Sequence, residues 1–137
     1  MERNLGRAHR LGEDMEIERY EAGALMSQAV VHEGTVYLAG QIALENRNAD
    51  VSVQAREIFA RIDALLAATG SGRDCLLSVT IWLCRVESFA ALNTEWAAWL
   101  GEAPKPVRAT ICGIALALPG LEIEVMVTAA RRQNLPR

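Results

Sequence analysis

Apolar residues recur at helical spacing in two segments of the chain. Between residues 51 and 66 they fall every three or four positions, which predicts an amphipathic helix packed on one face. Asp50 or Ser52 can cap its start, and Gly70 and Gly72 supply a stop. A second helix is predicted from Ser88 to Gly101, with one apolar stripe. The members of that stripe are Phe89, Leu92, Trp96 and Trp99.

Strand patterns occupy most of the remaining chain. β-Branched or alternating apolar residues predict strands at 15–20, 27–33, 35–41, 76–84, 106–117 and 121–129. Glu33-Gly34 predicts a hairpin between the second and third of these strands. Residues 76–84, LLSVTIWLC, are nearly all apolar, which is typical of a strand in the middle of a sheet.

The order of elements, β-β-β-α-β-α-β-β, predicts an α+β domain with both helices on one face of a mixed sheet. We expect a single domain over residues 1–137, with a core of about 15–130 and frayed termini that include the tail RRQNLPR. The other face of the sheet is too apolar for water. A closed cyclic homo-oligomer would bury it and create grooves between subunits, where small-molecule sites are common.

Composition and charge narrow the classes of function. A net charge of -3 argues against a nucleic-acid partner, because such surfaces carry many lysines and arginines. Three separate cysteines form neither a disulfide framework nor a metal knuckle. No leader-like apolar stretch and no run of about 20 apolar residues is present, so we expect a cytoplasmic protein without a membrane partner.

The search for catalytic chemistry leaves one arginine and a few carboxylates. With only His9 and His32 in the chain, a catalytic triad, a Cys-His dyad and a metal site are poorly supported. Phosphate-binding glycine motifs are absent from the sequence. Arg108, in the apolar run KPVRATIC, can bind a carboxylate through two parallel hydrogen bonds. A structural ion pair is an equally good interpretation at this point.

Two glutamates near the C-terminus are the candidate partners of this arginine. Glu122 and Glu124 alternate with apolar residues, so both point to one face, where one could be catalytic or both simply solvated. If the last two strands form a tight hairpin about residues 118–121, Arg108 and Glu122 lie roughly 23 Å apart. Either the order of strands differs, or the glutamate reaches the arginine from a neighbouring subunit.

Four short motifs in order carry a resemblance to a known family. They are Gly40-Gln41 after a strand, the run Phe89-Ala90-Ala91-Leu92-Asn93, then Pro106-Val107-Arg108, and last Glu122-Ile123-Glu124. Over about residues 25–130 the chain resembles the RidA/YjgF family of reactive-intermediate deaminases, also called L-PSP endoribonucleases. The resemblance implies a chorismate-mutase-like fold and a homotrimer with its sheets facing inward and three clefts between subunits.

The resemblance also implies an activity. It is hydrolysis of enamines and imines of 2-oxo acids, such as 2-iminobutanoate, to the 2-oxo acid and ammonia, with no cofactor. Arg108 matches the residue that grips the substrate carboxylate, and Glu122 the residue that positions water, although Glu124 stays open for that role. Gly40 and Asn93 match residues that line the cleft.

Three positions depart from the family pattern. Met26 stands where a tyrosine is common and Ala39 where a serine is common, while Thr110 takes the place of a cysteine whose backbone contacts substrate. The mouth of the cleft is therefore expected to be more apolar. Two other functions remain open, a non-catalytic trimer that binds or senses a small carboxylate through Arg108, and an endoribonuclease.

Overall fold

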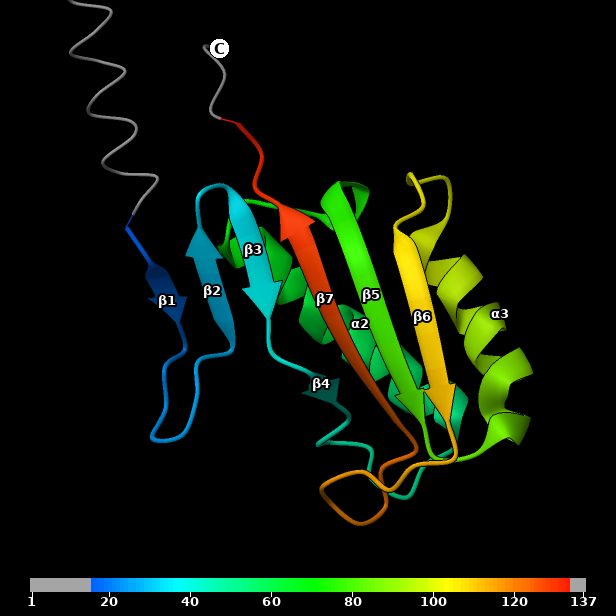
Figure 1. Ribbon diagram of the computed structural model, residues 1–137. Helices are drawn as coiled ribbons and strands as arrows, with labels where there is room; N and C mark the ends of the chain where they lie inside the picture. The colour runs from blue at the N-terminus through cyan, green and yellow to red at the C-terminus, as the bar shows by residue number, and fades with distance from the viewer. Residues whose placement is uncertain (1–15, 134–137) are drawn as a thin grey trace, which may run out of the picture.

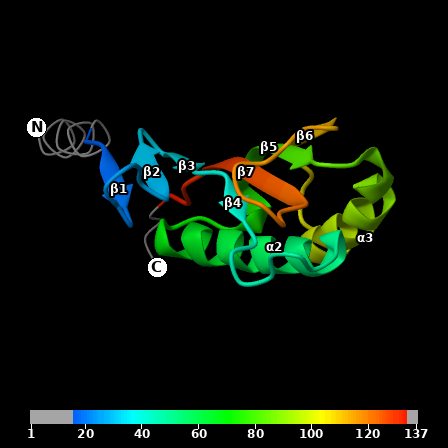
Figure 2. The ribbon, with the colours of Figure 1, turned by 90° about the horizontal axis from the view of Figure 1, so that it is seen from below.

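A single mixed sheet with helices on one face forms the core of the computed structural model, which describes residues 16–133. The strands run in the order β1-β2-β3-β7-β5-β6, with β4 also paired to β7 (Figure 1). Helices α2 and α3 lie on the same side of the sheet (Figure 2). The predicted α+β architecture is confirmed. The bounds are β1 Glu18–Tyr20, β2 Ala29–His32, β3 Thr35–Leu38, β4 Gln41–Ile42, α2 Val51–Ala68, β5 Leu76–Leu83, α3 Phe89–Leu100, β6 Val107–Cys112 and β7 Ile123–Ala130.

Both helices begin and end at the predicted signals. The Asp50 carboxylate accepts a hydrogen bond of 3.0 Å from the Val53 backbone N–H, which caps α2. Gly70 follows the helix with φ +79°, and Gly101 ends α3 with φ +56°, two backbone conformations that favour glycine. The helices pack through stacked rings of Phe59 and Trp99, whose centroids lie 4.5 Å apart. In the part of the chain that the structure describes, neither helix is long and apolar enough to cross a membrane.

The predicted hairpin at Glu33-Gly34 is confirmed. β2 and β3 pair antiparallel from Ala29 opposite Leu38 to His32 opposite Thr35. Glu33 and Gly34 have φ values of +50° and +77°, as the two-residue turn with the twist of a hairpin requires. The predicted position of residues 76–84 is also confirmed, because β5 pairs with β6 on one side and with β7 on the other.

The tight hairpin considered for the last two strands is wrong. β5 lies between β6 and β7, pairing parallel to β6 and antiparallel to β7. Helix α3 joins β5 to β6 as a crossover connection, which makes these two strands parallel. β6 ends at Cys112, earlier than predicted, and residues 113–122 carry the chain past β5 to the start of β7.

The sheet face opposite the helices carries large apolar side chains. On β7, buried residues alternate with partly exposed ones, and the partly exposed set lies on this face. Side chains that are more than a third exposed there come from β3, β6 and β7. They are Tyr37, Val107, Ile111 and Met126. The uncovered apolar face expected from the sequence is therefore present in a single chain.

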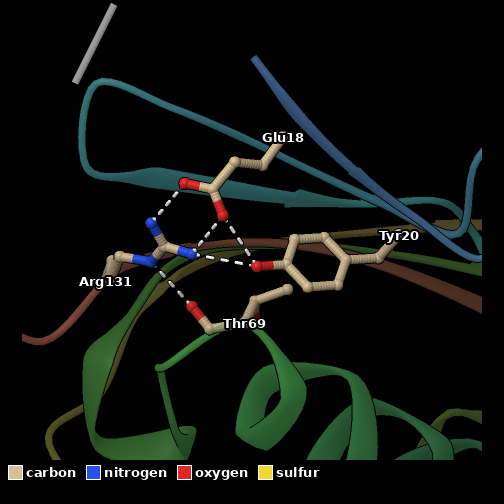
Figure 3. Close-up of polar contacts among 4 residues, drawn as sticks. All are labelled: Glu18, Tyr20, Thr69 and Arg131. Atoms are coloured by element: carbon tan, nitrogen blue, oxygen red, sulfur yellow. Dashed lines mark hydrogen bonds and ion pairs between the residues drawn. The ribbon is translucent and has the colours of Figure 1, made fainter. Parts of the chain in front are cut away.

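Arg131, which follows β7, links the C-terminal end of the described chain to β1 near its N-terminal end. Arg131 donates hydrogen bonds of 2.7 and 2.8 Å to the Glu18 carboxylate, one of 3.0 Å to the Tyr20 hydroxyl and one of 2.9 Å to the Thr69 carbonyl (Figure 3). Its neighbour Arg132 pairs with Asp74 at 2.6 Å. The first residues of the tail expected to fray are thus anchored. Met15 and His9, and residues 134–137, lie outside the described residues.

The ion pair between Glu18 and Arg131 predicts a pH-dependent contribution to stability. Hydrogen bonds from Arg131 lower the pKa of Glu18 from 4.5 to about 2. The contribution is therefore complete above about pH 4.5 and is lost as the pH falls toward 2. Glu18→Gln is expected to lower the free energy of unfolding by about 1 kcal/mol at pH 7, since both side chains are partly exposed.

Urea unfolding of wild type and Glu18→Gln at pH 7 and at pH 3 measures this effect. The difference between the two proteins should shrink at pH 3, whereas the exposed control Glu102→Gln should match wild type at both values. A difference that stays constant between the two pH values would show that the ion pair does not stabilise the fold.

Candidate functional site

Arg108 lies on β6 with its side chain turned toward α3. It pairs in register with the buried Val79 of β5, so it shares the face that the helices cover. The guanidinium donates a hydrogen bond of 2.7 Å to the Asn93 side-chain oxygen. It also lies over the rings of Trp96 and Phe89, 5.2 and 5.9 Å from their centroids. Helix α3 thus supplies every side chain that holds this arginine among the described residues.

The surroundings of Arg108 suit an anion that comes from elsewhere. Burial lowers the pKa of Arg108 from its ordinary value, but the side chain stays a cation at neutral pH. Within residues 16–133 no carboxylate lies within ion-pair distance of it. A partly desolvated arginine with an amide as its partner binds a carboxylate strongly, because little water competes. Within the described residues of one chain, Arg108 therefore forms no structural ion pair.

Thr110 is the next residue of β6 on the same face. It lies opposite Ile81 of β5. Its hydroxyl is buried and has no hydrogen-bond partner among the described residues. Because an unpaired buried hydroxyl is costly, this position is one where a further polar group would be stabilising.

A cleft of about 570 Å³ opens between the β1–β2 loop, β4, β7 and α2. Met26, Gly40 and Glu124 are among its lining residues, so three positions singled out from the sequence meet here. Ala39 lies next to it, where its backbone N–H donates a hydrogen bond of 2.9 Å to the Gln28 carbonyl. The wall that α2 contributes was not predicted, since the apolar stripe of this helix predicts only a core.

Gly40 and Glu124 touch closely within this cleft. A Cβ atom at position 40 would lie 2.0 Å from the Glu124 Oε2 atom, so any side chain there would displace the carboxylate. Burial raises the pKa of Glu124. The carboxylate has neither a hydrogen bond nor an ion pair within residues 16–133. Glycine at position 40 therefore leaves room for the Glu124 carboxylate.

Glu122 lies two residues earlier, immediately before β7, and is partly buried like Glu124. Its carboxylate is 3.4 Å from the Arg85 guanidinium. Its backbone is held on both sides, since its N–H donates to the Gln54 side chain at 2.8 Å and its carbonyl accepts from the Cys84 N–H at 3.1 Å. Gln54 is fully buried in α2 and also donates to the Gly120 carbonyl. These hydrogen bonds fix the position of the Glu122 backbone.

The arginine and the two glutamates do not meet within one chain. Arg108 and Val127 both pair with Val79, so Glu122 is five residues, or roughly 17 Å, further along the sheet. Glu124 pairs with Trp82, on the face opposite the buried Val79. The chain thus brings Arg108 together with Asn93 and Thr110, and Gly40 together with Met26 and Glu124. The two groups lie on different parts of the molecule.

Several residues that build these groups were missed from the sequence. Gln54 is a buried polar side chain of α2, and a glutamine beside an apolar stripe resembles an exposed position until its partners are known. Arg85 was not predicted because a single exposed arginine between a strand and a helix is an ordinary surface residue. Trp96 was found as part of a helical stripe, which does not reveal that its ring lies beneath an arginine.

Comparison with known proteins gives consistent results. The family model described as endoribonuclease L-PSP matches residues 16–131. The RutC family protein YoaB of Escherichia coli is 37% identical over 116 residues, covering 85% of this chain and 99% of YoaB. The crystal structure of a YjgF family member from Neisseria meningitidis is 28% identical, with a TM-score of 0.83 over 88% of this chain and 98% of that protein. A crystal structure from Pseudomonas aeruginosa is 38% identical, with a TM-score of 0.80 over 85% of this chain and 100% of that protein.

Proposed function

The chain belongs to the endoribonuclease L-PSP family, also known as the RidA, YjgF or RutC family, and from this premise we propose that it hydrolyses 2-imino acids to 2-oxo acids and ammonia. The observation that supports this most directly is Arg108. Its guanidinium is partly desolvated, is flanked by two aromatic rings, and has an amide but no carboxylate beside it among residues 16–133. A 2-imino acid supplies the missing carboxylate next to its reactive carbon.

A homotrimer would complete the site. The uncovered sheet face carries Tyr37, Val107, Ile111 and Met126, a surface that a second copy of the chain can bury. β6 is an edge strand of the sheet, so the Arg108 group lies where a neighbouring subunit can approach. In this arrangement Arg108 and Asn93 of one subunit face Gly40, Met26 and Glu122 of the next. The distance between the two groups within one chain supports a site shared between subunits.

Substrate binding in this site begins with the carboxylate. Arg108 donates two parallel hydrogen bonds to it, and Asn93 fixes the plane of the guanidinium. Trp96 and Phe89 keep water away from the charge pair, which strengthens it. Holding the carboxylate also places the adjacent C=N carbon, so that water can be delivered to it in one direction.

The hydrolysis needs one base and then one acid at the same place. As water attacks, its oxygen bonds to C2, Glu122 takes a proton from it, and the imine nitrogen receives the electron pair of the C=N bond together with a proton. The imine nitrogen takes its first proton from bulk water. In the resulting carbinolamine Glu122 returns its proton to the nitrogen, the C2–N bond breaks to release ammonia, and the hydroxyl proton passes to bulk water as the carbonyl forms. One imine and one water thus give one 2-oxo acid and one ammonia, with Glu122 restored.

The family name contains the word endoribonuclease, so ribonuclease activity is another candidate function. A chain with a net charge of -3 lacks the excess of lysine and arginine that binding an RNA backbone requires. The sequence therefore favours a small anionic substrate over RNA. A trimer that binds a small carboxylate without turnover would use the same arginine, and only a rate measurement separates it from an enzyme.

The experiment that tests the proposal generates 2-iminobutanoate with an amino acid oxidase and follows its disappearance with and without the protein. Free imines hydrolyse in water, so the measured quantity is the rate above that background. We expect the protein to accelerate ammonia release at catalytic concentration. Binding of 2-oxobutanoate without acceleration would favour the carboxylate-binding trimer and would rule out the enzyme.

A further inference from the structure

The cleft beside Gly40 has an apolar lining that the chemistry of imine hydrolysis does not require. Its mouth carries Met26, 51% exposed, and Leu44, 46% exposed, two flexible side chains that water covers when the cleft is empty. Apolar atoms of β4, α2 and the loop before β7 continue this surface inward. These residues are Ile42, Ala64, Leu65 and Ala117. A bound apolar group would bury this surface and gain free energy.

Two of the polar side chains of the cleft form hydrogen bonds within the chain. Gln41 donates hydrogen bonds to the Gln28 side chain at 3.0 Å and to the Ala39 carbonyl at 2.9 Å. Arg61 donates to the Glu57 carboxylate at 2.9 Å. A ligand with a polar side chain would therefore find few free partners in this part of the cleft, and its own groups would lose their water.

The remaining charges in the cleft are negative. Glu21 and Glu124 both line it, and neither carboxylate has an ion pair within residues 16–133. A second carboxylate on the ligand would be repelled by both. Charge and polarity thus favour the same class of ligand, one with a single carboxylate and an apolar side chain.

The size of the cleft also favours a ligand with a bulky apolar side chain. A volume of about 570 Å³ is within the range of pockets for small organic ligands. The alanine-derived imino acid has only about six non-hydrogen atoms and the leucine-derived one about nine, so the larger molecule fills much more of such a pocket. The small substrate would leave Met26 and Leu44 in water.

We propose that the cleft selects 2-imino acids with bulky apolar side chains, which pack against Met26 and Leu44, and rejects those with a second carboxylate. The inference rests on the proposed imine hydrolysis and assigns its substrate class. The reactive end of the substrate stays with Arg108, and the cleft receives the side chain.

The test compares kcat/KM for imines generated from leucine, alanine and aspartate. We expect the leucine-derived imine to exceed the alanine-derived one by about tenfold or more, and the aspartate-derived one to be the poorest. Met26→Ala should raise KM several-fold more for the leucine-derived imine than for the alanine-derived one. The matched control is Leu25→Ala, because Leu25 is 96% exposed and does not line the cleft. Glu124→Gln should raise the rate for the aspartate-derived imine relative to the leucine-derived one.

Calorimetric binding of the corresponding 2-oxo acids separates two kinds of failure. Hydrolysis at equal kcat/KM for all three imines would overturn the selectivity and leave the proposed function intact. Tighter binding of 4-methyl-2-oxopentanoate than of 2-oxopropanoate, without any turnover, would overturn the proposed function and support the selectivity of the cleft. Equal binding of these two acids with no turnover would overturn both.

Discussion

Arg108→Ala is expected to lower kcat/KM for imine hydrolysis by about 100- to 10,000-fold. Two hydrogen bonds from a charged donor to the substrate carboxylate are lost together, and each contributes about 1.5–3 kcal/mol in a partly dry site. Only part of this loss in binding energy appears as weaker substrate binding. The rest lowers kcat, because a loosely held substrate presents its C=N carbon poorly to water. Steady-state rates with 2-iminobutanoate, corrected for spontaneous hydrolysis, measure the loss.

The controls for this prediction address charge and folding separately. Arg108→Lys keeps the charge but not the paired geometry, so it should recover only part of the activity. Arg56→Ala removes an exposed arginine of α2 that pairs with Glu95, and should leave the rate unchanged. Arg108→Ala should also unfold at nearly the same urea concentration as wild type, since Asn93 is its only hydrogen-bond partner among residues 16–133. A wild-type rate in Arg108→Ala would contradict the proposed role of this residue.

The elements could be predicted from the sequence because the signals that define them are local. Asp50 and Gly70 lie at the two ends of α2, and Gly101 ends α3. The turn at Glu33-Gly34 needs only two residues with positive φ to reverse the chain. In each case the interacting residues are neighbours in the sequence, so the local sequence pattern is enough to predict the element.

The order of the strands could not be predicted in the same way. The run Leu118-Pro119-Gly120 has the composition of a tight turn, yet β6 and β7 are separated by β5. Which strands pair depends on the crossover through α3 and on the burial of β5 from both sides, and neither is local. The partners of Arg108 show the same limit, because Asn93 and Trp96 reach it only once α3 lies against β6.

An experiment must decide whether Glu122 or Glu124 is the catalytic base, because the family resemblance favours Glu122 whereas Glu124 is the one that lines the cleft. The family resemblance assigns the role of base to Glu122, whose backbone Gln54 clamps and whose carboxylate lies 3.4 Å from Arg85. Glu124 is the one beside Gly40, where burial disfavours its ionised form and raises its pKa. The carboxylate that reaches the attacking water is the one that can take its proton.

Glu122→Gln is therefore expected to lower kcat by about 100-fold or more, since an amide of the same shape cannot accept the proton of the attacking water. Binding of 2-oxobutanoate should stay within a few-fold of wild type, because Arg108 still holds the carboxylate. Glu124→Gln should keep at least about a tenth of the wild-type kcat on 2-iminobutanoate, and the exposed control Glu87→Gln should keep all of it. The reverse ranking, with Glu124→Gln the more damaging change, would transfer the role of base to Glu124 and place the reacting carbon beside Gly40.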